Sequence, residues 1–256
     1  MKRAITLTLL IFLLFMAGCA TAPVQKEPII PAKRTVPENV VPEKQQAFYA
    51  YDPWEPMNRR IYIFNAVFDE YVFLPVVKAY EFILPEFAQT GVTNFFNNLY
   101  EISNLTNSLL QGKIVKFFNT FGRIAMNTTV GLGGLIDVAT HEGVQRENED
   151  FGQTLAFYGL GPGPYLVLPI LGPSNLRDTG GLVVDTVAYS LMLDALIHQL
   201  DMDDTDEDIL KYSLTGLYAI DKRHKEAFRY YMTGSPFEYE IIRKLYNVQR
   251  KFLIEH

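Results

Sequence analysis

The sequence has little cysteine, little histidine and no cluster of basic residues, and each shortage removes a class of function. Its 256 residues include a single cysteine, which excludes an internal disulfide and a cysteine-rich zinc site. The formal net charge is −6, and nucleic-acid-binding proteins instead present clustered lysine and arginine, so no nucleic-acid partner is expected. The 48% hydrophobic content is that of an ordinary globular domain.

Catalytic signatures are also missing. The sequence contains no G-x-S-x-G elbow, no phosphate-binding P-loop and no H-E-x-x-H zinc motif. Its histidines lie far apart without carboxylates at a ligand spacing, and we expect them at the surface. They are His141, His198, His224 and His256. The sequence therefore predicts neither an enzyme nor a metal site.

An acidic cluster over residues 201–208 is the nearest approach to a metal-binding motif. Asp206 stands where a calcium loop needs glycine, and Tyr212 stands where it needs a bidentate glutamate. The cluster instead places favourable negative charge at the start of a helix that we expect from Thr205.

The N-terminus has the pattern of a lipoprotein signal. Lys2 and Arg3 precede an uncharged run of 15 residues, too short for a membrane span of ~20 residues. The run ends in Met-Ala-Gly-Cys19, which resembles the bacterial lipobox. We expect residues 1–18 to be a signal peptide and Cys19 to carry three acyl chains, which exceed what stable anchoring needs. An ordinary secretory signal with an incidental cysteine is the alternative.

The segment after the cysteine separates the anchor from the folded body. Ala20 rather than aspartate follows Cys19, which by resemblance to lipoproteins of Gram-negative bacteria indicates the outer membrane. Residues 19–50 are spaced by prolines and predict an extended tether. Residues 51–256 then form one domain, and about 200 residues are enough to bury a sizeable core.

The body is predicted to be all-α, with helices separated by glycine and proline. Asp52-Pro53-Trp54-Glu55-Pro56 indicates a helix start with Asp52 as N-cap, and Ser235-Pro236 with Glu238 indicates another through a capping box. Apolar spacing predicts helices over 57–72, 76–83, 86–99, 101–111, 113–126, 182–200, 205–232 and 237–252. The first of these has no clean polar face, so it is either a central core helix or a helix in lipid.

Two apolar segments do not fit regular helices. Residues 130–137 are rich in glycine, and residues 151–176 run for 26 residues without a charge but contain nine glycines and prolines that oppose a continuous helix. Irregular backbone survives at membrane depth only where protein buries it or where it lines a watery cavity. The second segment therefore predicts close packing or a channel wall, with a rigid loop across an ordinary core as the alternative.

Charged side chains at helical spacing suggest two local features. Asp194 and His198 are placed to pair as i and i+4, and Lys113, Lys116 and Arg123 share one helix as a basic stripe. Both patterns are typical of solvated helix faces. The functional alternative for the stripe is contact with phospholipid phosphates or an acidic partner.

Four ordered blocks give a specific resemblance. They are DPWEPMNR over 52–59, NTTVGLGGLIDVA over 127–139, DFGQTL over 150–155 and GPGPYLVLP with GPSNLRD between 161 and 178. Together with the lipobox they resemble the MlaA (VacJ) family of outer-membrane lipoproteins, over roughly Tyr51 to Arg223. The proline-spaced tether departs from the family pattern.

The resemblance implies a single helical domain, ring-shaped and embedded in the inner leaflet of the outer membrane on its periplasmic side, held against a trimeric porin. Phospholipids misplaced in the outer leaflet would pass through an amphipathic channel in the ring. They would then reach a soluble, MlaC-like periplasmic carrier and an inner-membrane transporter. No cofactor is expected beyond the acyl chains on Cys19.

A headgroup crossing hydrocarbon needs a polar path, and polar residues of the matched region are the candidates for this channel or its rim. Three glycines that allow hinge or close-packing geometry are added to them. The candidates are Asn58, Arg59, Asn65, Asn127, Gly131, Gly133, Gly134, Asp137, Arg177 and Asp178. The alternative is that these polar side chains cap helices and satisfy the turns. Two other functions stay open, a porin-associated structural scaffold and a lipid hydrolase.

Overall fold

The computed structural model describes residues 51–255 of the chain. The predicted signal peptide, Cys19 and the tether over 19–50 lie outside the described residues, as does His256. The described part belongs to one compact unit.

The described residues are mainly helical, as predicted. The helices are α3 (Glu55–Phe68), the π-helix η1 (Asp69–Phe73), α4 (Leu74–Ile83), α5 (Glu86–Leu110), α6 (Ile114–Thr129), α7 (Val138–His141), α8 (Phe151–Phe157), α9 (Leu176–His198), α10 (Asp204–Lys225) and α11 (Glu238–Glu255). A two-stranded antiparallel hairpin, β1 (Tyr165–Leu168) and β2 (Gly172–Asn175), interrupts them. The sequence did not predict this hairpin.

Several helix boundaries differ from the predicted ones. The segments predicted over 86–99 and 101–111 form one continuous helix, α5, because no glycine or proline lies at the predicted break near residue 100. Helix α9 begins at Leu176 rather than 182, because the Asn175 side chain caps it by accepting a bond from the Asp178 N–H at 2.8 Å. Helix α10 ends at Lys225, seven residues before the predicted end at Met232.

The two predicted capping arrangements are wrong. Helix α3 begins at Glu55 without a side-chain cap, and the Asp52 carboxylate instead accepts bonds from Asn58 at 2.8 Å and Tyr239 at 2.6 Å. The Glu238 carboxylate does not accept the Ser235 N–H, which donates to Thr233 instead. It accepts bonds from Tyr62 and from the Tyr231 N–H. Both carboxylates therefore join distant segments rather than cap a helix of their own.

The apolar stretch over 151–176 is irregular, as predicted, but more ordered than a loop. It contains the short helix α8, capped by the Asp150 carboxylate that accepts from the Gln153 N–H, and then the hairpin. In the hairpin Tyr165 pairs with Asn175 and Leu168 pairs with Gly172.

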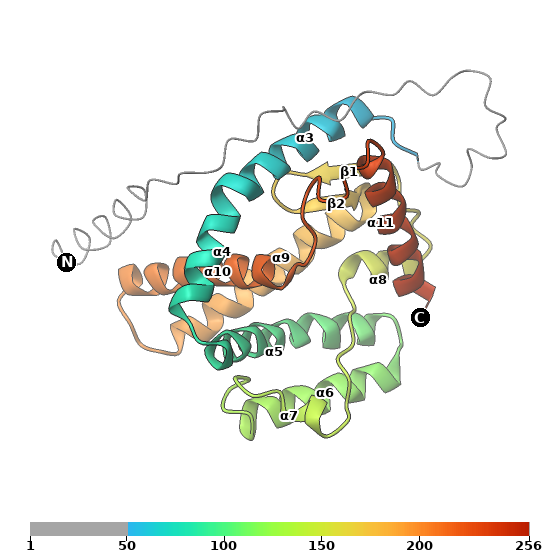
Figure 1. Ribbon diagram of the computed structural model, residues 1–256. Coiled ribbons are helices and arrows are strands. Elements are labelled where there is room, and N and C mark those ends of the chain that lie inside the picture. The colour runs from blue at the N-terminus through green and yellow to red at the C-terminus, as the bar shows by residue number, and fades with distance from the viewer. Residues whose placement is uncertain (1–50, 256) are drawn as a thin grey trace, which may run out of the picture. The chain divides into compact units, whose positions relative to one another are not determined.

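Figure 1 shows how the elements surround the hairpin. The antiparallel pair α5 and α6 packs together along one side, and α9 and α10 lie next to each other in the middle of the view. Helix α3 packs on β1, while α11 contacts α8 and β2 near the C-terminus. Three helices distant in sequence therefore contact the hairpin: α3, α9 and α11.

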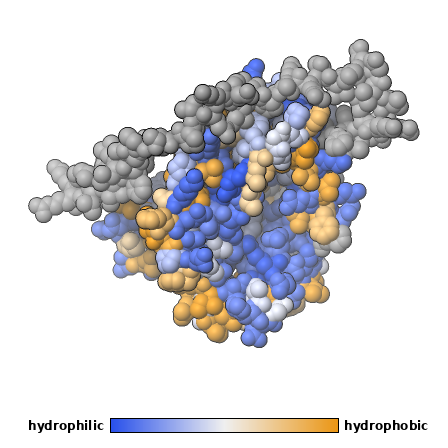
Figure 2. Space-filling view, in the orientation of Figure 1, coloured by the Kyte–Doolittle hydropathy of each residue, from blue (hydrophilic) through white to orange (hydrophobic). Residues whose placement is uncertain are grey.

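Polar side chains outnumber apolar ones in the interior of the described part. Among the buried residues 22 are polar or charged and 11 are hydrophobic, whereas 42 large hydrophobic side chains are exposed. Figure 2 shows apolar side chains gathered along the edges of one face, around a hydrophilic centre. A water-soluble monomer seldom exposes so much contiguous apolar surface, which marks a membrane or a protein partner.

Helix α9 carries part of this apolar surface. It is the one helix of the described residues that is long and apolar enough to cross a membrane, judged by length and composition alone. Only 22% of its most apolar window is buried, with Val183, Val187 and Leu191 among the exposed side chains.

Candidate functional site

An amphipathic cavity of about 520 Å³ lies between α3, η1, the hairpin turn, α10 and α11. This volume is in the usual range for a site that binds a small molecule. One part of its lining is polar and comprises Asn65, Asp69, Lys222, Arg223, Glu226 and Gln249. The rest is mainly apolar and includes Phe68, Phe73, Ile170, Leu171, Pro173, Phe228, Ile242 and Leu245. The cavity therefore suits a molecule with one polar end and one apolar end.

Asn65 holds the hairpin turn at the cavity wall. Its side-chain amide donates to the Leu168 carbonyl at 2.9 Å, and its oxygen accepts from the Ile170 N–H at 2.7 Å. Ile170 has a φ of 68°, a conformation that is costly for a β-branched residue. Among the candidate channel residues predicted from the sequence, Asn65 is the one that lines this cavity.

Asn58 makes the same kind of contact three residues earlier in the hairpin. Its amide donates to the Tyr165 carbonyl at 3.0 Å and accepts from the Val167 N–H at 2.9 Å. Asn58 and Asn65 are seven residues apart and lie on one face of α3, so two amides supply the hydrogen bonds that a further strand would make to β1. This attaches α3 to the hairpin and fixes one wall of the cavity.

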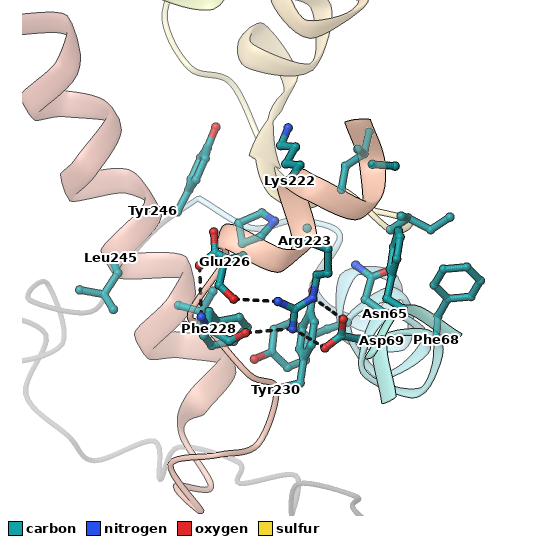
Figure 3. Close-up of a pocket in the computed structure, with 18 of the residues that line it drawn as sticks. Asn65, Phe68, Asp69, Lys222, Arg223, Glu226, Phe228, Tyr230, Leu245 and Tyr246 are labelled. Carbon is teal, nitrogen blue, oxygen red and sulfur yellow. Dashed lines mark hydrogen bonds and ion pairs between the residues drawn. The ribbon is translucent and has the colours of Figure 1, made fainter. Parts of the chain in front are cut away.

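A buried ion pair forms the polar end of the cavity. Arg223 on α10 donates to both carboxylate oxygens of Asp69 in η1, the second at 2.7 Å, and also to the Phe228 carbonyl. Figure 3 shows this pair among the side chains that line the cavity. The hydrogen bonds with Asp69 raise the pKa of Arg223 despite partial burial, so the guanidinium stays charged. The π-helix η1 orients the Asp69 carboxylate towards this arginine, and π-helical turns are frequently found at functional sites.

Tyr62 and Glu238 link α3 to α11 behind the cavity. The Tyr62 hydroxyl donates to Glu238 at 2.7 Å, and the same carboxylate accepts from the Tyr231 N–H at 2.6 Å and from Thr233. Burial, followed by the bond to Glu238, raises the pKa of Tyr62 well above its usual value. The linker over 226–237 is thereby tied to both helices.

Arg59 lies outside the cavity, on the surface between α3 and α11. It donates to Glu55 at 2.8 Å and to Glu240 at 2.5 Å, and its guanidinium stacks 4.3 Å from the centre of the Tyr239 ring. These contacts join α3 to α11.

A second group of candidate residues lies at the end of α6. Asp137 caps α7 by accepting from the Thr140 N–H, and it also binds Asn127 and Arg123. Burial opposes ionisation of Asp137, but the bonds from Thr140, Asn127 and Arg123 outweigh it and lower the pKa to about 2. Arg123 is almost fully buried and donates to Glu101 at 2.8 Å.

The three candidate glycines in this region differ in their surroundings. A Cβ atom on Gly131 would lie 2.2 Å from the Ile136 carbonyl oxygen, and one on Gly134 would lie 2.6 Å from the Asn98 Cβ. Gly133 has a φ of 72° but no atom within 4 Å of the position of a Cβ. Close packing therefore requires glycine at two of the three positions, whereas Gly133 provides a left-handed backbone only.

Arg177 and Asp178 form a third group at the start of α9. They pair with each other at 2.8 Å, and Asp178 also accepts from Arg250 of α11 at 2.8 Å. Arg250 binds Asp150 as well, and although burial opposes it, this pairing holds the pKa of Asp150 below its usual value. The three groups of candidate residues are thus apart from one another, each in a network of its own.

The predicted basic stripe is not a solvated helix face. Lys113 and Lys116 both bind the buried Glu149 carboxylate, at 2.9 Å and 2.7 Å, and Arg123 is paired with Glu101 and Asp137. Carboxylates of the same chain therefore occupy all three cations.

The predicted pairing of Asp194 with His198 is also wrong. Asp194 pairs with Lys211 at 2.6 Å, and His198 contacts Glu207. Both of these partners are on α10. His141 and His198 are exposed, as predicted, but His224 is half-buried against Glu81 and the Tyr80 ring.

The acidic cluster has the position expected for it. Helix α10 begins at Asp204 with Asp206 and Glu207 in its first turn, where negative charge stabilises a helix. Within residues 51–255 no three His, Cys, Asp or Glu side chains are grouped so that they could hold a metal ion.

The sequence missed most of the polar residues that line the cavity: Asp69, Lys222, Arg223, Glu226 and Gln249. A signal existed for one of them, since Asp69 follows Asn65 by four residues in a largely apolar stretch. Its partner lies 154 residues away, which no local spacing indicates.

Comparison with known proteins places the fold in a family. The chain matches the model of the MlaA lipoprotein family over residues 50–253. An uncharacterized protein of Rickettsia prowazekii (strain Madrid E) is 40% identical over 143 residues, covering 56% of this chain and 57% of that protein. The intermembrane phospholipid transport system lipoprotein MlaA of Escherichia coli (strain K12) is 43% identical over 138 residues, covering 52% and 55%. The chain thus aligns with little more than half the length of these curated relatives.

A solved structure supports the same assignment. It comes from work on the structural basis for maintenance of bacterial outer membrane lipid asymmetry. It is 31% identical, with a TM-score of 0.59, and the match covers 80% of this chain and all of that one. Because the family match includes nearly all of the described residues, the chain belongs to the MlaA lipoprotein family.

Proposed function

We propose that the protein is an outer-membrane lipoprotein that removes mislocalised phospholipids from the outer leaflet and passes them to a periplasmic carrier. The observation that carries this proposal is the inverted distribution of side chains around an amphipathic cavity. Among the described residues 42 large hydrophobic side chains are exposed, while polar side chains outnumber hydrophobic ones in the interior. The name of the relative from Escherichia coli, which refers to intermembrane phospholipid transport, supports the substrate class.

The proposed location follows from the anchor and from the apolar surface. Acyl chains on Cys19 hold the protein in the outer membrane, and the exposed apolar side chains embed the body in the inner leaflet, on the periplasmic side. A trimeric porin beside the body and an MlaC-like carrier below it are the proposed protein partners.

The proposed mechanism is a passive conduit without catalysis and without a cofactor. A phosphate group moves through hydrocarbon only if polar groups replace its water, and the polar lining of the cavity supplies such groups next to apolar walls for the tails. Asn65 and the neighbouring Asp69–Arg223 pair belong to this path. The other candidate channel residues do not line the cavity, and their partners within the chain favour a role in holding its walls in place.

The test is the amount of outer-leaflet phospholipid in a strain that lacks the gene, measured by labelling of surface-exposed lipid. The complementing variants are wild type, Cys19→Ala and Ala219→Trp, which fills the cavity from α10. Ser213→Trp adds the same bulk at an exposed position of the same helix and is the matched control.

We expect excess surface phospholipid in the deletion strain, corrected by wild type and Ser213→Trp but poorly by Cys19→Ala and Ala219→Trp. Normal asymmetry in the deletion strain, together with porin binding by the wild-type protein, would favour the scaffold function instead. Release of fatty acid by the purified protein would favour a hydrolase. If both tryptophan variants corrected the defect equally, at equal protein levels, the cavity would not be part of the transport path.

A further inference from the structure

Three cationic side chains converge between α10, α5 and the segment before α8. Lys222 and Lys225 are on α10, and Arg146 lies between α7 and α8. The Arg146 Nη1 donates to the Asn97 side-chain oxygen at 2.5 Å, and the Lys225 Nζ donates to the same oxygen at 3.3 Å. One neutral oxygen of α5 is therefore shared by two positive groups, an arrangement that leaves their charge unbalanced.

The nearby carboxylates are engaged elsewhere. Glu101 is 3.7 Å from the Arg146 Nε but forms its short ion pair with Arg123 at 2.8 Å. The buried Arg146 Nε has no hydrogen-bond partner among the described residues. Asp221 accepts a bond from Thr93.

Charge repulsion within the group is consistent with this excess. Burial lowers the pKa of Lys225, and repulsion from Arg146 and Lys222 lowers it further, although Asp221 opposes the shift. An anion bound among the three cations would remove that repulsion.

Lys222 connects this cationic group to the amphipathic cavity. It lines the cavity, and in Figure 3 its side chain extends away from the Asp69–Arg223 pair. Within the part of the chain that the structure describes, its ammonium has no hydrogen-bond or ion-pair partner, and it lies 5.9 Å from the centre of the Tyr218 ring. Burial lowers the pKa of Lys222, and the charge of Glu226 opposes this shift. Lys222 is thus a cation without a direct ion pair, placed between the amphipathic cavity and two further cations.

We propose that Arg146, Lys222 and Lys225 bind the phosphate of a phospholipid headgroup while its acyl chains occupy the adjacent cavity. Arginine and lysine are the side chains that bind phosphate most strongly, through charge-assisted hydrogen bonds. The apolar walls beside Lys222 select a phosphate that carries hydrocarbon chains over a free phosphate ion. This assignment deepens the proposed function and rests on it for the choice of lipid.

The test measures binding of lipids to the purified full-length protein in a neutral detergent. The probes are dioleoylphosphatidylglycerol, dioleoylglycerol, which has the same chains without the phosphate, and inorganic phosphate. The test variant is Lys222→Gln/Lys225→Gln, and Lys222→Arg/Lys225→Arg keeps the charge. The matched control is Lys78→Gln/Lys251→Gln, which removes the same charge at two exposed positions away from the cavity.

We expect the glutamine variant to bind the phospholipid about tenfold more weakly than wild type, because it has lost charge-assisted hydrogen bonds. It should bind dioleoylglycerol as tightly as wild type does. The arginine variant and the control should bind both lipids normally. Equal weakening for both lipids, or an equal effect of the control, would overturn the assignment. Inorganic phosphate that binds as tightly as the phospholipid would assign the group to free phosphate and overturn the lipid assignment.

The outcomes separate this inference from the proposed function. If wild type binds neither lipid, the proposed function fails together with the inference. If wild type and the glutamine variant bind the phospholipid equally, only the inference fails. If binding depends on the lysines while the deletion strain keeps normal asymmetry, the headgroup site stands and the transport function fails.

Discussion

The side chain of Asn65 forms hydrogen bonds with the backbone around Ile170 as a neighbouring strand would. Its oxygen accepts the Ile170 N–H at 2.7 Å while its nitrogen donates to the Leu168 carbonyl two residues earlier. The pair of bonds holds a β-branched residue at a φ of 68° and so stabilises a strained turn at the cavity wall. The shape of the cavity therefore depends on one amide of α3.

Replacing this amide should destabilise the whole domain. Asn65→Ala leaves the Ile170 N–H and the Leu168 carbonyl without partners in a partly buried place, and we expect a loss of about 2 kcal/mol. For a domain of this size that lowers Tm by roughly 4–8 °C, measurable by circular dichroism in detergent. Asn119→Ala, at an exposed position of α6, is the control and should leave Tm unchanged. Equal Tm values for the two variants would contradict this role.

The glycine segment after α6 allows a comparison between two neighbouring positions. Gly131→Ala would place a methyl group 2.2 Å from the Ile136 carbonyl oxygen, so the turn must open, and we expect a loss above about 3 kcal/mol. Gly133→Ala meets no atom within 4 Å and should cost only about 1 kcal/mol for its left-handed backbone. Unfolding by denaturant compares the two variants, and a larger effect at Gly133 would argue against the packing described for Gly131.

Local patterns in the sequence explain which parts of this structure were predictable. Glycine and proline mark most helix ends, so the all-α fold followed from them, and the four sequence blocks indicated the family. Helices do begin near Asp52 and Ser235, as predicted, but the capping roles assigned to Asp52 and Glu238 were wrong because these carboxylates bind partners on other elements. A carboxylate that caps its own helix and one that accepts hydrogen bonds from a distant segment can have the same local sequence, so spacing alone does not distinguish them.

The polar end of the cavity shows the same limit for the site. Asp69 and Arg223 are 154 residues apart, and Lys222 is one of several basic residues in the last turn of an ordinary amphipathic helix. Only the packing of α3 and η1 against α10 brings these residues together. Asn65 was a candidate only as a polar residue of the region that resembles the family, and no local signal distinguished it from Asp69 or from the cations of α10.

The low pKa of Asp137 predicts a pH dependence of stability. Its pKa falls from 3.8 to about 2 on folding, so the ionised carboxylate stabilises the fold fully above pH 4, and that stabilisation is lost as the pH falls through 2. The shift corresponds to at most about 2 kcal/mol. We expect Asp137→Asn to be less stable than wild type by a constant amount at pH 5–7 and to approach it towards pH 2. A difference that persists unchanged at pH 2 would show that the charge of Asp137 is not its cause.

The apolar surface predicts membrane association without the acyl anchor. Residues 20–256 exported behind an unrelated cleavable signal lack Cys19 but keep the 42 exposed large hydrophobic side chains, whose burial in lipid is favourable at about 25 cal/mol per Å². We expect this protein to sediment with membranes, to resist a high-salt wash and to be released by detergent. It should be spread over both membranes, because the lipidated cysteine rather than the body directs sorting, and this agrees with poor complementation by Cys19→Ala. Recovery of the protein as a monomer in the soluble periplasmic fraction would show that the apolar surface is covered in some way other than by lipid.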